Sequence, residues 1–382
     1  MENNVSLISP DSDLLLWGVV IGIVGLGFWA EQKTRIGKTL TGIIVAMSFT
    51  MLLSNLKIIP TSAPVYDSIF SGILPVAIPL LLFRADLRRI FGDGGPTLSA
   101  FLIGTTGIVI GVSLATVLVP LGDLSAVAAG LFTATYTGGS ANFAAVAVAT
   151  NFNDGATLTS MIAADVIATN FQTMLLVALP GIALVRKFYG TTVADLAAMD
   201  GAAHVPFQLK ELNMPGLCLA VALAYLLVAA GNTAAELIGN SAYGILFASA
   251  FALIIGNFMR PVVERMSGDF EAGIFLVFLF LVALAAGADV WILAQDGPVY
   301  LIYASIILAV HTLFLVVLAR FMKLDIRAVV IGSTACVGGV ASASAIASAK
   351  GWRDLILPGI LVGTFGNAIG TFLGVWMWTL LN

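Results

Sequence analysis

Long uninterrupted apolar runs make up most of the chain, and short polar segments separate them. Runs of about 20 apolar residues are typical of helices that cross a bilayer, whereas membrane β-barrels show alternating segments of about ten residues. Two apolar segments, 126–150 and 327–349, are rich in Gly, Ser, Thr and Ala. The other runs predict ten membrane-spanning helices, at about 13–30, 36–54, 66–83, 97–119, 156–185, 214–231, 240–257, 270–290, 298–319 and 355–381.

The composition agrees with a polytopic membrane protein. Of the 382 residues 59% are hydrophobic and 10% are charged, whereas soluble domains are about 25% charged. The net charge of −4 gives no basic surface for nucleic acid. The two cysteines, Cys218 and Cys336, are too few and too far apart for a disulfide framework or a four-thiolate metal site.

No motif in the sequence indicates an enzyme. Residues 37–39 resemble the end of a P-loop, but Gln32 stands where that motif has glycine and no strand precedes it. No HExxH or GxSxG motif and no cysteine–histidine pair is present. An intramembrane enzyme or a lipid-handling protein is therefore the weaker alternative, and we expect no catalytic residues and no resident cofactor other than bound Na⁺.

The two halves of the sequence resemble each other at an offset of about 200 residues. TYTGGSANFAAVAVAT from Thr135 aligns with ACVGGVASASAIASAK from Ala335. We interpret the match as a duplication, although a biased composition is the alternative. It predicts a first repeat of five spans and a Gly-Gly segment at 13–186, a cytoplasmic linker at 187–213, and a second such repeat at 214–382.

The distribution of Lys and Arg predicts the topology. If all twelve apolar segments crossed the membrane, 8 of the 17 basic residues would lie on one side of it and 9 on the other. If both Gly-Gly segments are re-entrant hairpins, 16 lie on one side and only Lys57 on the other; with one hairpin the number is 14. The positive-inside rule thus favours two hairpins, both termini outside, and halves of opposite orientation. Such an inverted repeat is typical of alternating-access secondary transporters.

The paired glycines mark the predicted hairpin tips and a candidate solute site. They allow a tight reversal at membrane depth, and the unpaired N–H groups of the half-helix after each tip would face the midplane. Close helix packing is the alternative explanation of the glycines. The predicted solute-binding residues are Thr137, Gly138, Gly139, Ser140, Asn142, Gly338, Gly339, Ser342 and Ser344.

Asp165 is the clearest acid within a span, and an ionisable group at that depth is a functional candidate. Its counterpart is Val362, so the two-acid site of a proton antiporter is missing. Asn170 and its counterpart Asn367 could present amide oxygens to Na⁺. A structural acid and helix–helix hydrogen bonds are the alternatives. The predicted ion-coupling residues are Asp165, Thr169, Asn170, Gln172, Thr364 and Asn367.

Other polar and small residues within the spans suggest structural roles. We expect His311 to bond to a neighbouring helix rather than relay protons. We expect Asp86 and Asp289 to cap or anchor helix ends. A stripe of small residues in the last span is expected to pack against a hairpin rather than bind a ligand; it comprises Gly359, Gly363, Gly366, Gly370 and Gly374.

The segments FTATYTGGSANFAAVA, STACVGGVASASAIA and GNAIGTFLG resemble the YjcL-like family of membrane proteins, from about Leu14 to Leu380. That family is grouped with the cation–proton antiporters and anion transporters, which include bile-acid–sodium and citrate–sodium symporters. The resemblance implies an inverted-repeat fold, a panel domain and a mobile core domain with elevator-like movement. By analogy with the citrate symporters, it implies solute and sodium binding at residues 138–140 and 338–339. In other members, crossing broken helices replace the hairpins.

We therefore expect a Na⁺- or H⁺-coupled secondary transporter of the cytoplasmic membrane for a small organic anion or acidic solute. All 17 basic residues lie in loops or at span ends, so an anion would rest on half-helix N-termini and a co-bound cation. A Na⁺/H⁺-type antiporter using Asp165 is the alternative. The expected partners are the solute, the coupling cation and the bilayer; a homodimer through the non-mobile domain is left open.

Overall fold

A computed structural model describes residues 6–190, 212–239, 243–287, 290–350 and 352–382. These residues form helices and connecting turns, with no strand among them. Eight of the helices are long and apolar enough to cross a membrane. The prediction of an all-α integral membrane protein is confirmed.

A helix occupies each of the ten predicted spans. The first half contains α1 (Asp13–Lys33), α2 (Arg35–Asn55), α3 (Pro64–Ser68), η1 (Ile69–Ile73), α4 (Leu74–Leu82), α5 (Leu87–Asp93), α6 (Gly95–Leu118), η2 (Gly122–Leu124), α7 (Ser125–Gly138), α8 (Ser140–Ala149), α9 (Gly155–Ala178), η3 (Leu179–Gly181) and α10 (Ala183–Tyr189). The second half contains α12 (Met214–Ile238), α13 (Gly244–Phe258), α14 (Arg260–Val263), α15 (Asp269–Ala286), α16 (Val290–Phe321), α17 (Ile326–Ala349) and α18 (Arg353–Leu381). Residues 191–211 of the predicted linker lie outside the described residues.

Local sequence signals determine where several helices begin. The Asp154 carboxylate accepts a hydrogen bond from the Ala156 N–H at 3.2 Å and caps α9. The Asn213 side chain caps α12 in the same way, at 2.8 Å from the Gly216 N–H. Such caps satisfy N–H groups that have no partner within the helix.

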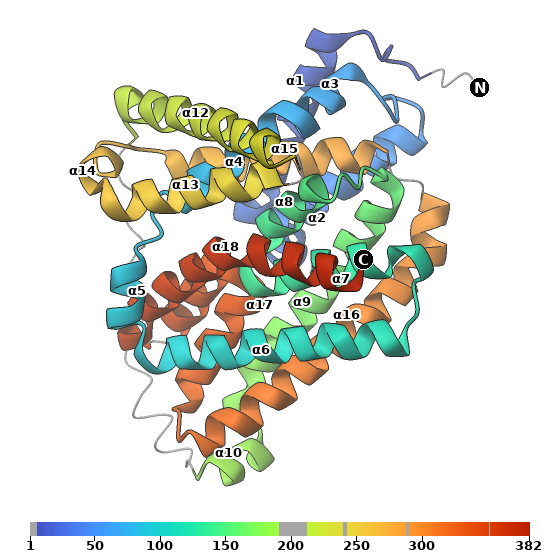
Figure 1. Cartoon of the computed structure of the whole chain (residues 1–382). Helices are drawn as coiled ribbons and strands as arrows, with labels where there is room; N and C mark the ends of the chain where they lie inside the picture. Colours follow the sequence, from blue (N-terminus) through green and yellow to red (C-terminus); the bar gives the residue numbers. More distant parts are fainter. Residues whose placement is uncertain (1–5, 191–211, 240–242, 288–289, 351) are drawn as a thin grey trace.

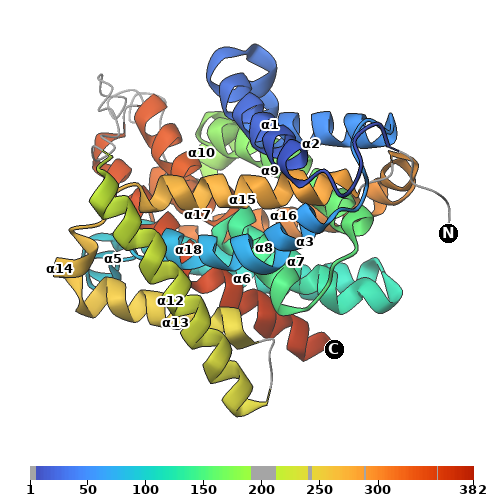
Figure 2. The same cartoon turned by 90° about the horizontal axis from the view of Figure 1, so that it is seen from above.

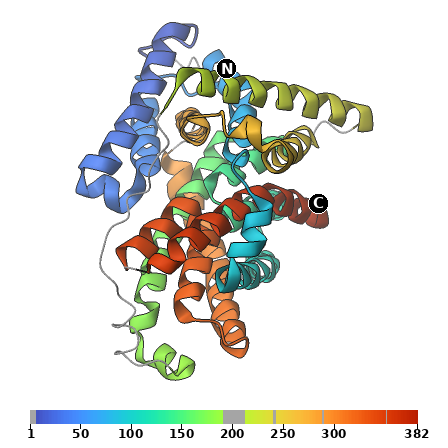
Figure 3. The same ribbon diagram turned by 90° about the vertical axis from the view of Figure 1, so that its left-hand side faces the viewer.

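The helices form two layers, which Figure 1 shows from the side and Figure 2 from above, where one layer overlies the other. The scaffold layer contains α1–α4 and α12–α15, and the core layer contains α6–α9 and α16–α18. In the scaffold layer, Phe28 of α1 stacks on Phe278 of α15, with ring centroids 4.3 Å apart. In the core layer, the hydroxyls of Thr116 on α6 and Tyr303 on α16 are 2.7 Å apart. Figure 3 shows the blue and yellow scaffold helices above the red helices of the core layer. Each layer therefore combines helices from both halves of the sequence.

The first Gly-Gly segment is a helical hairpin. Gly139, between α7 and α8, has φ 90° and ψ 175°, which favours glycine. Glycine has no Cβ atom, so the room beside it can be described by the contacts that an added Cβ would make. A Cβ added at Gly374 of α18 would lie 2.7 Å from both Gly130 O on α7 and Val146 Cγ2 on α8. In a continuous helix, residues 130 and 146 would be about 24 Å apart. The chain therefore reverses at Gly139, and both arms pack against α18.

The second Gly-Gly segment reverses in the same way, within α17. Gly339 has φ 71° and ψ −166°. A Cβ atom at Gly359 of α18 would lie 2.9 Å from Ile331 Cγ2 and 3.5 Å from Ala343 Cβ, one on each side of Gly339. Arg327, at the start of the first arm, pairs with Asp354, which follows the second arm, at 3.4 Å. Both ends of this hairpin therefore lie at the same end of the core layer.

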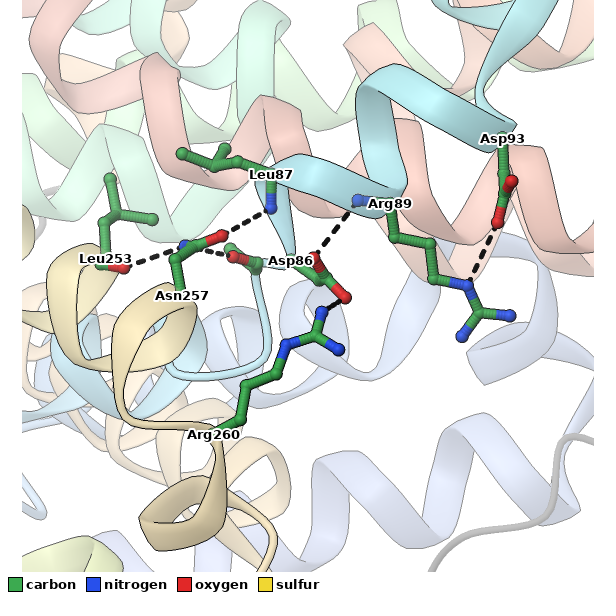
Figure 4. A network of polar contacts seen from close by, with 8 residues as sticks. Asp86, Leu87, Arg89, Asp93, Leu253, Asn257 and Arg260 are labelled. Atoms are coloured by element: carbon green, nitrogen blue, oxygen red, sulfur yellow. Dashed lines mark hydrogen bonds and ion pairs between the residues drawn. The ribbon is translucent and has the colours of Figure 1, made fainter.

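Residues 83–94 connect the two layers and are fixed by a polar network (Figure 4). Asp86 caps α5 and forms an ion pair with Arg260 of α14. The Asn257 side chain accepts a hydrogen bond from the Leu87 N–H at 2.8 Å. The prediction that Asp86 caps or anchors a helix is confirmed, while Asp289 lies outside the described residues.

Candidate functional site

The two hairpin tips face each other inside the protein. A Cβ atom at Gly339 would lie 4.0 Å from the carbonyl oxygen of Gly138, and this would be its nearest contact. A Cβ atom at Gly139 would have no heavy atom within 4 Å. The two glycines with positive φ therefore border open space rather than packed side chains.

That open space is a cavity of about 560 Å³ between the core and scaffold layers. Its scaffold side is mainly apolar, with Phe28, Ile43 and Val277 among the lining residues. Its core side contains both tips and polar residues of α9 and α18. Ten of the predicted site residues line it: Gly138, Gly139, Ser140, Asp165, Thr169, Asn170, Gly338, Gly339, Ser342 and Asn367.

Asp165 is the deepest acid of this cavity, with 3% of its surface exposed. Its carboxylate accepts hydrogen bonds from the Thr135 and Thr169 hydroxyls, each at 3.2 Å. No described Lys or Arg lies within 4 Å of it, and none lines the cavity. Within the described structure, the charge of an ionised Asp165 is therefore not compensated by a basic side chain.

Four further polar side chains of the cavity are available to a ligand. Asn170 and Asn367 are half-buried, one on α9 and one on α18. Ser140 and Ser342 each follow a hairpin tip. None of the four side chains is hydrogen-bonded to another described residue. The alternative of helix–helix hydrogen bonding for the two asparagines therefore finds no support among the described contacts.

The other five predicted site residues do not line the cavity. Asn142 accepts hydrogen bonds from the N–H and hydroxyl of Thr371, at 3.0 and 2.7 Å, and so ties α8 to α18. Gln172 donates to Thr312 of α16 at 2.6 Å and faces away from the cavity, toward that helix. The hydroxyl of Thr364 donates to the carbonyl oxygen of Ile360. The remaining two residues are Thr137, which is buried, and Ser344.

The cavity extends toward one end of the molecule. Glu31 and Gln32 at the end of α1 and Phe270 at the start of α15 line it there. At the opposite end the two layers are in direct contact, since a Cβ atom at Gly155 of α9 would lie 3.3 Å from Leu284 O of α15. The structure is therefore open between the layers at one end and packed at the other.

The small residues of α18 have a packing role, as predicted. A Cβ atom added at Gly363 would lie 2.8 Å from Val340 Cα. One added at Gly366 would lie 3.1 Å from the Phe101 ring. At Gly370 it would lie 2.8 Å from the Asn142 side chain. The absence of side chains at these positions allows α18 to approach both hairpins closely.

His311 bonds to neighbouring helices, as predicted. Both ring nitrogens of buried His311 are within hydrogen-bond distance of neighbouring helices, at 2.8 Å from Gly104 O and 2.7 Å from the Ser333 hydroxyl. Cys218 and Cys336 are free thiols. The described residues contain no cluster of three or more His, Cys, Asp or Glu that could hold a metal ion, and residues 37–39 lie within α2 rather than in a strand-to-helix loop.

Comparison with known proteins identifies the family. The family described as "Protein of unknown function (DUF819)" matches residues 18–382. The chain belongs to the DUF819 family. It is 30% identical to the "Uncharacterized membrane protein YjcL" of Bacillus subtilis (strain 168), over 97% of this chain and 98% of that protein. The predicted YjcL-like resemblance is confirmed, and this DUF819 protein is a multi-pass membrane protein.

Three polar residues that line the cavity or hold predicted site residues of this DUF819 protein in place were not predicted from the sequence. Thr135 belongs to the repeated segment, but its bond to Asp165 depends on how α7 packs on α9. Thr371 lies beside the glycine stripe and fixes Asn142. Glu31 lines the open end of the cavity and accepts a hydrogen bond from the Gly42 N–H at 3.0 Å. The only sequence signal that could have indicated Glu31 is its position at the polar end of the first span.

Proposed function

We propose that this protein is a secondary active transporter of the cytoplasmic membrane, coupled to H⁺ or Na⁺, that carries a small organic anion or acidic solute. The observation that carries the proposal is the position of Asp165. This acid lines the same cavity as both hairpin tips, and no described basic side chain accompanies it there.

The environment of Asp165 supports cation coupling. Burying an ionised carboxylate without a partner costs several kcal/mol, and two threonine hydroxyls offset only part of that cost. A proton or a Na⁺ ion would supply the missing compensation. Na⁺ is a hard cation that binds oxygen ligands, and Asn170 and Asn367 have amide oxygens at the same cavity.

The hairpin tips support binding of an anion beside that cation. Half-helices start after Gly139 and Gly339. The first N–H groups of a helix lack a partner within it, and the helix dipole favours negative charge there. Ser140 and Ser342 add hydroxyls. A volume of about 560 Å³ is within the usual range for small-molecule sites.

The directions of equivalent helices support an inverted repeat. Contacts of α6 with α16 pair Gly104 with His311 at one end and Thr116 with Tyr303 at the other, so the two helices run antiparallel. They hold equivalent positions, since each immediately precedes a hairpin. Opposite orientation of equivalent spans is the arrangement found in many alternating-access transporters.

The two-layer construction supports an elevator-like movement, which resemblance to the anion-transporter superfamily also implies. The core layer contains both hairpins, and the scaffold surface that faces them is largely apolar. With 16 of 17 basic residues inside, the cavity would open to the cytoplasm and both termini would lie outside. The exposed Leu226 and Leu237 of α12 make the scaffold layer the expected side of a homodimer.

A Na⁺/H⁺-type antiporter is the second candidate, because Asp165 is available to either cation and no organic solute is needed for exchange. Two experiments separate the candidates. A thermal-shift screen of purified protein against carboxylates, amino acids and acidic peptides, with and without Na⁺, should identify a stabilising anion for the symporter. Na⁺ alone should dissipate a pH gradient in proteoliposomes only if the protein is the antiporter.

A further inference from the structure

A groove on the core layer, separate from the central cavity, runs between α9 and α16. Its volume is about 690 Å³, and most of its lining is apolar, including Phe171 of α9 and Leu301 and Leu313 of α16. Two side chains of this lining are largely exposed, with 72% of Phe171 and 68% of Leu313 accessible. We call this feature the α9/α16 groove.

The length of the α9/α16 groove matches a hydrocarbon chain. It extends from Leu301 to Val316 along α16, and from Ile167 of α9 to Leu179 at the start of η3. At 1.5 Å per residue these segments are about 18 to 22 Å long. One leaflet of a bilayer has a hydrocarbon depth of about 15 Å, so an acyl chain that lies obliquely in one leaflet can occupy the groove.

A basic cluster lies beyond the Val316 end of the groove. It consists of Arg186 and Lys187 on α10, Arg320 in the last turn of α16, and Lys323, two residues after that helix ends. The Tyr189 hydroxyl donates to Val316 O at 2.8 Å and thereby holds α10 beside this end (Figure 1).

The basic cluster has no acidic partner within the described structure. Arg320 donates instead to the carbonyl oxygen of Phe188, at 2.6 Å, and Arg186 donates to that of Gly181. None of the four basic residues forms an ion pair with a described carboxylate. Among the described residues, the groove therefore joins an apolar channel to a positive charge that no carboxylate compensates.

We propose that the α9/α16 groove binds an acyl chain of an anionic phospholipid, whose headgroup phosphate lies against the basic cluster. An amphiphile with a negative head complements both parts of the surface. A second copy of the chain, docked by the same face in a two-fold dimer, would bring like charges together. Basic residues beside a membrane attract anionic headgroups of the cytoplasmic leaflet, which is where the positive-inside rule places this cluster.

The test is lipid retention by the full-length protein, measured by native mass spectrometry from micelles that contain equal amounts of phosphatidylglycerol and phosphatidylcholine. One variant, Ala309→Trp, fills the groove, because Ala309 is an exposed lining residue. A second combines Arg186→Gln and Lys187→Gln and removes two charges. The matched controls are Val117→Trp, on an exposed face of α6 outside the groove, and Lys57→Gln, the one basic residue that the positive-inside rule places on the other side of the membrane.

The wild-type protein and both controls should retain phosphatidylglycerol in preference to phosphatidylcholine. The charge variant should retain phosphatidylglycerol about fivefold less for each charge removed, because a Lys or Arg at a membrane surface changes the affinity for an anionic headgroup by about that factor. The groove variant should lose bound lipid of both kinds. Equal retention in wild type and variants would overturn the proposal. A wild-type dimer that becomes monomeric only in Ala309→Trp would also overturn it, in favour of a second copy. Neither result depends on whether the protein transports a solute.

Discussion

Thr135 on α7 donates a hydrogen bond to Asp165 on α9 across 3.2 Å, and this bond links the first hairpin to the predicted ion-coupling acid. Thr135 lies one helical turn before the tip glycine Gly139, whose N–H donates to Thr135 O at 2.7 Å. A change in the charge of Asp165 would therefore act on the arm that carries the tip. In the proposed transporter, this contact would connect cation binding at Asp165 to solute binding at the tip.

Removing that hydroxyl should weaken the coupling without unfolding the protein. In Thr135→Val, an ionised Asp165 loses one donor, which is worth about 1.5 to 3 kcal/mol for a charged acceptor. We expect the cation concentration that gives half-maximal transport to change at least about tenfold. The control is Thr133→Val, because the buried Thr133 hydroxyl has no hydrogen-bond partner among the described residues. An equal effect of both substitutions would contradict the role of Thr135.

The hairpin tip should not tolerate a side chain at Gly139. Its φ of 90° strains any L-residue by about 1 to 2 kcal/mol, and the side chain of Gly139→Val would project into the open cavity. Solute uptake should be lost while the protein still purifies as a folded species. The control Gly22→Val lies on an exposed face of α1 where a Cβ meets nothing within 4 Å. Normal uptake by Gly139→Val would remove the tip from the solute pathway.

Packing of α18 against the first hairpin should be sensitive to a single methyl group. A Cβ atom at Gly374 would lie 2.7 Å from three atoms of α7 and α8, and overpacking of this kind costs about 1 to 3 kcal/mol. Gly374→Ala should therefore lower the melting temperature of the purified protein, whereas Gly22→Ala should not. Unchanged melting of Gly374→Ala would show that the hairpin is packed less tightly than the structure describes.

The hairpins predict which loops share a side of the membrane. In a Cys218→Ser background, single cysteines at Leu124 and Asn153, which flank the first hairpin, should both react with an impermeant maleimide added from outside. The remaining Cys336 is buried. Labelling of the two positions from opposite sides would make the first Gly-Gly segment a crossing helix.

The chain reversals at Gly139 and Gly339 could be predicted from the sequence because each depends on local chemistry, a Gly-Gly pair. The membrane topology that the count of charges indicates stays a prediction. The layers were not predicted from the chain itself, because α6 pairs with α16 and α7 with α18 across the two halves. Gln172 shows a similar limit. It lies seven residues after Asp165 and so nearly on the same helix face. Asp165 nevertheless contacts α7, whereas Gln172 contacts α16. Periodicity identifies a face and does not identify the neighbour that covers it.

The central claim is that Asp165 couples a cation to solute movement. The most direct test is uptake of a radiolabelled mixture of small carboxylates and acidic amino acids into proteoliposomes, driven by a Na⁺ or a pH gradient, for wild type, Asp165→Asn and the exposed-loop control Asp123→Asn. We predict gradient-driven uptake by wild type and the control, and none by Asp165→Asn, although all three proteins are folded. Wild-type uptake by Asp165→Asn with an unchanged dependence on the gradient would contradict the claim.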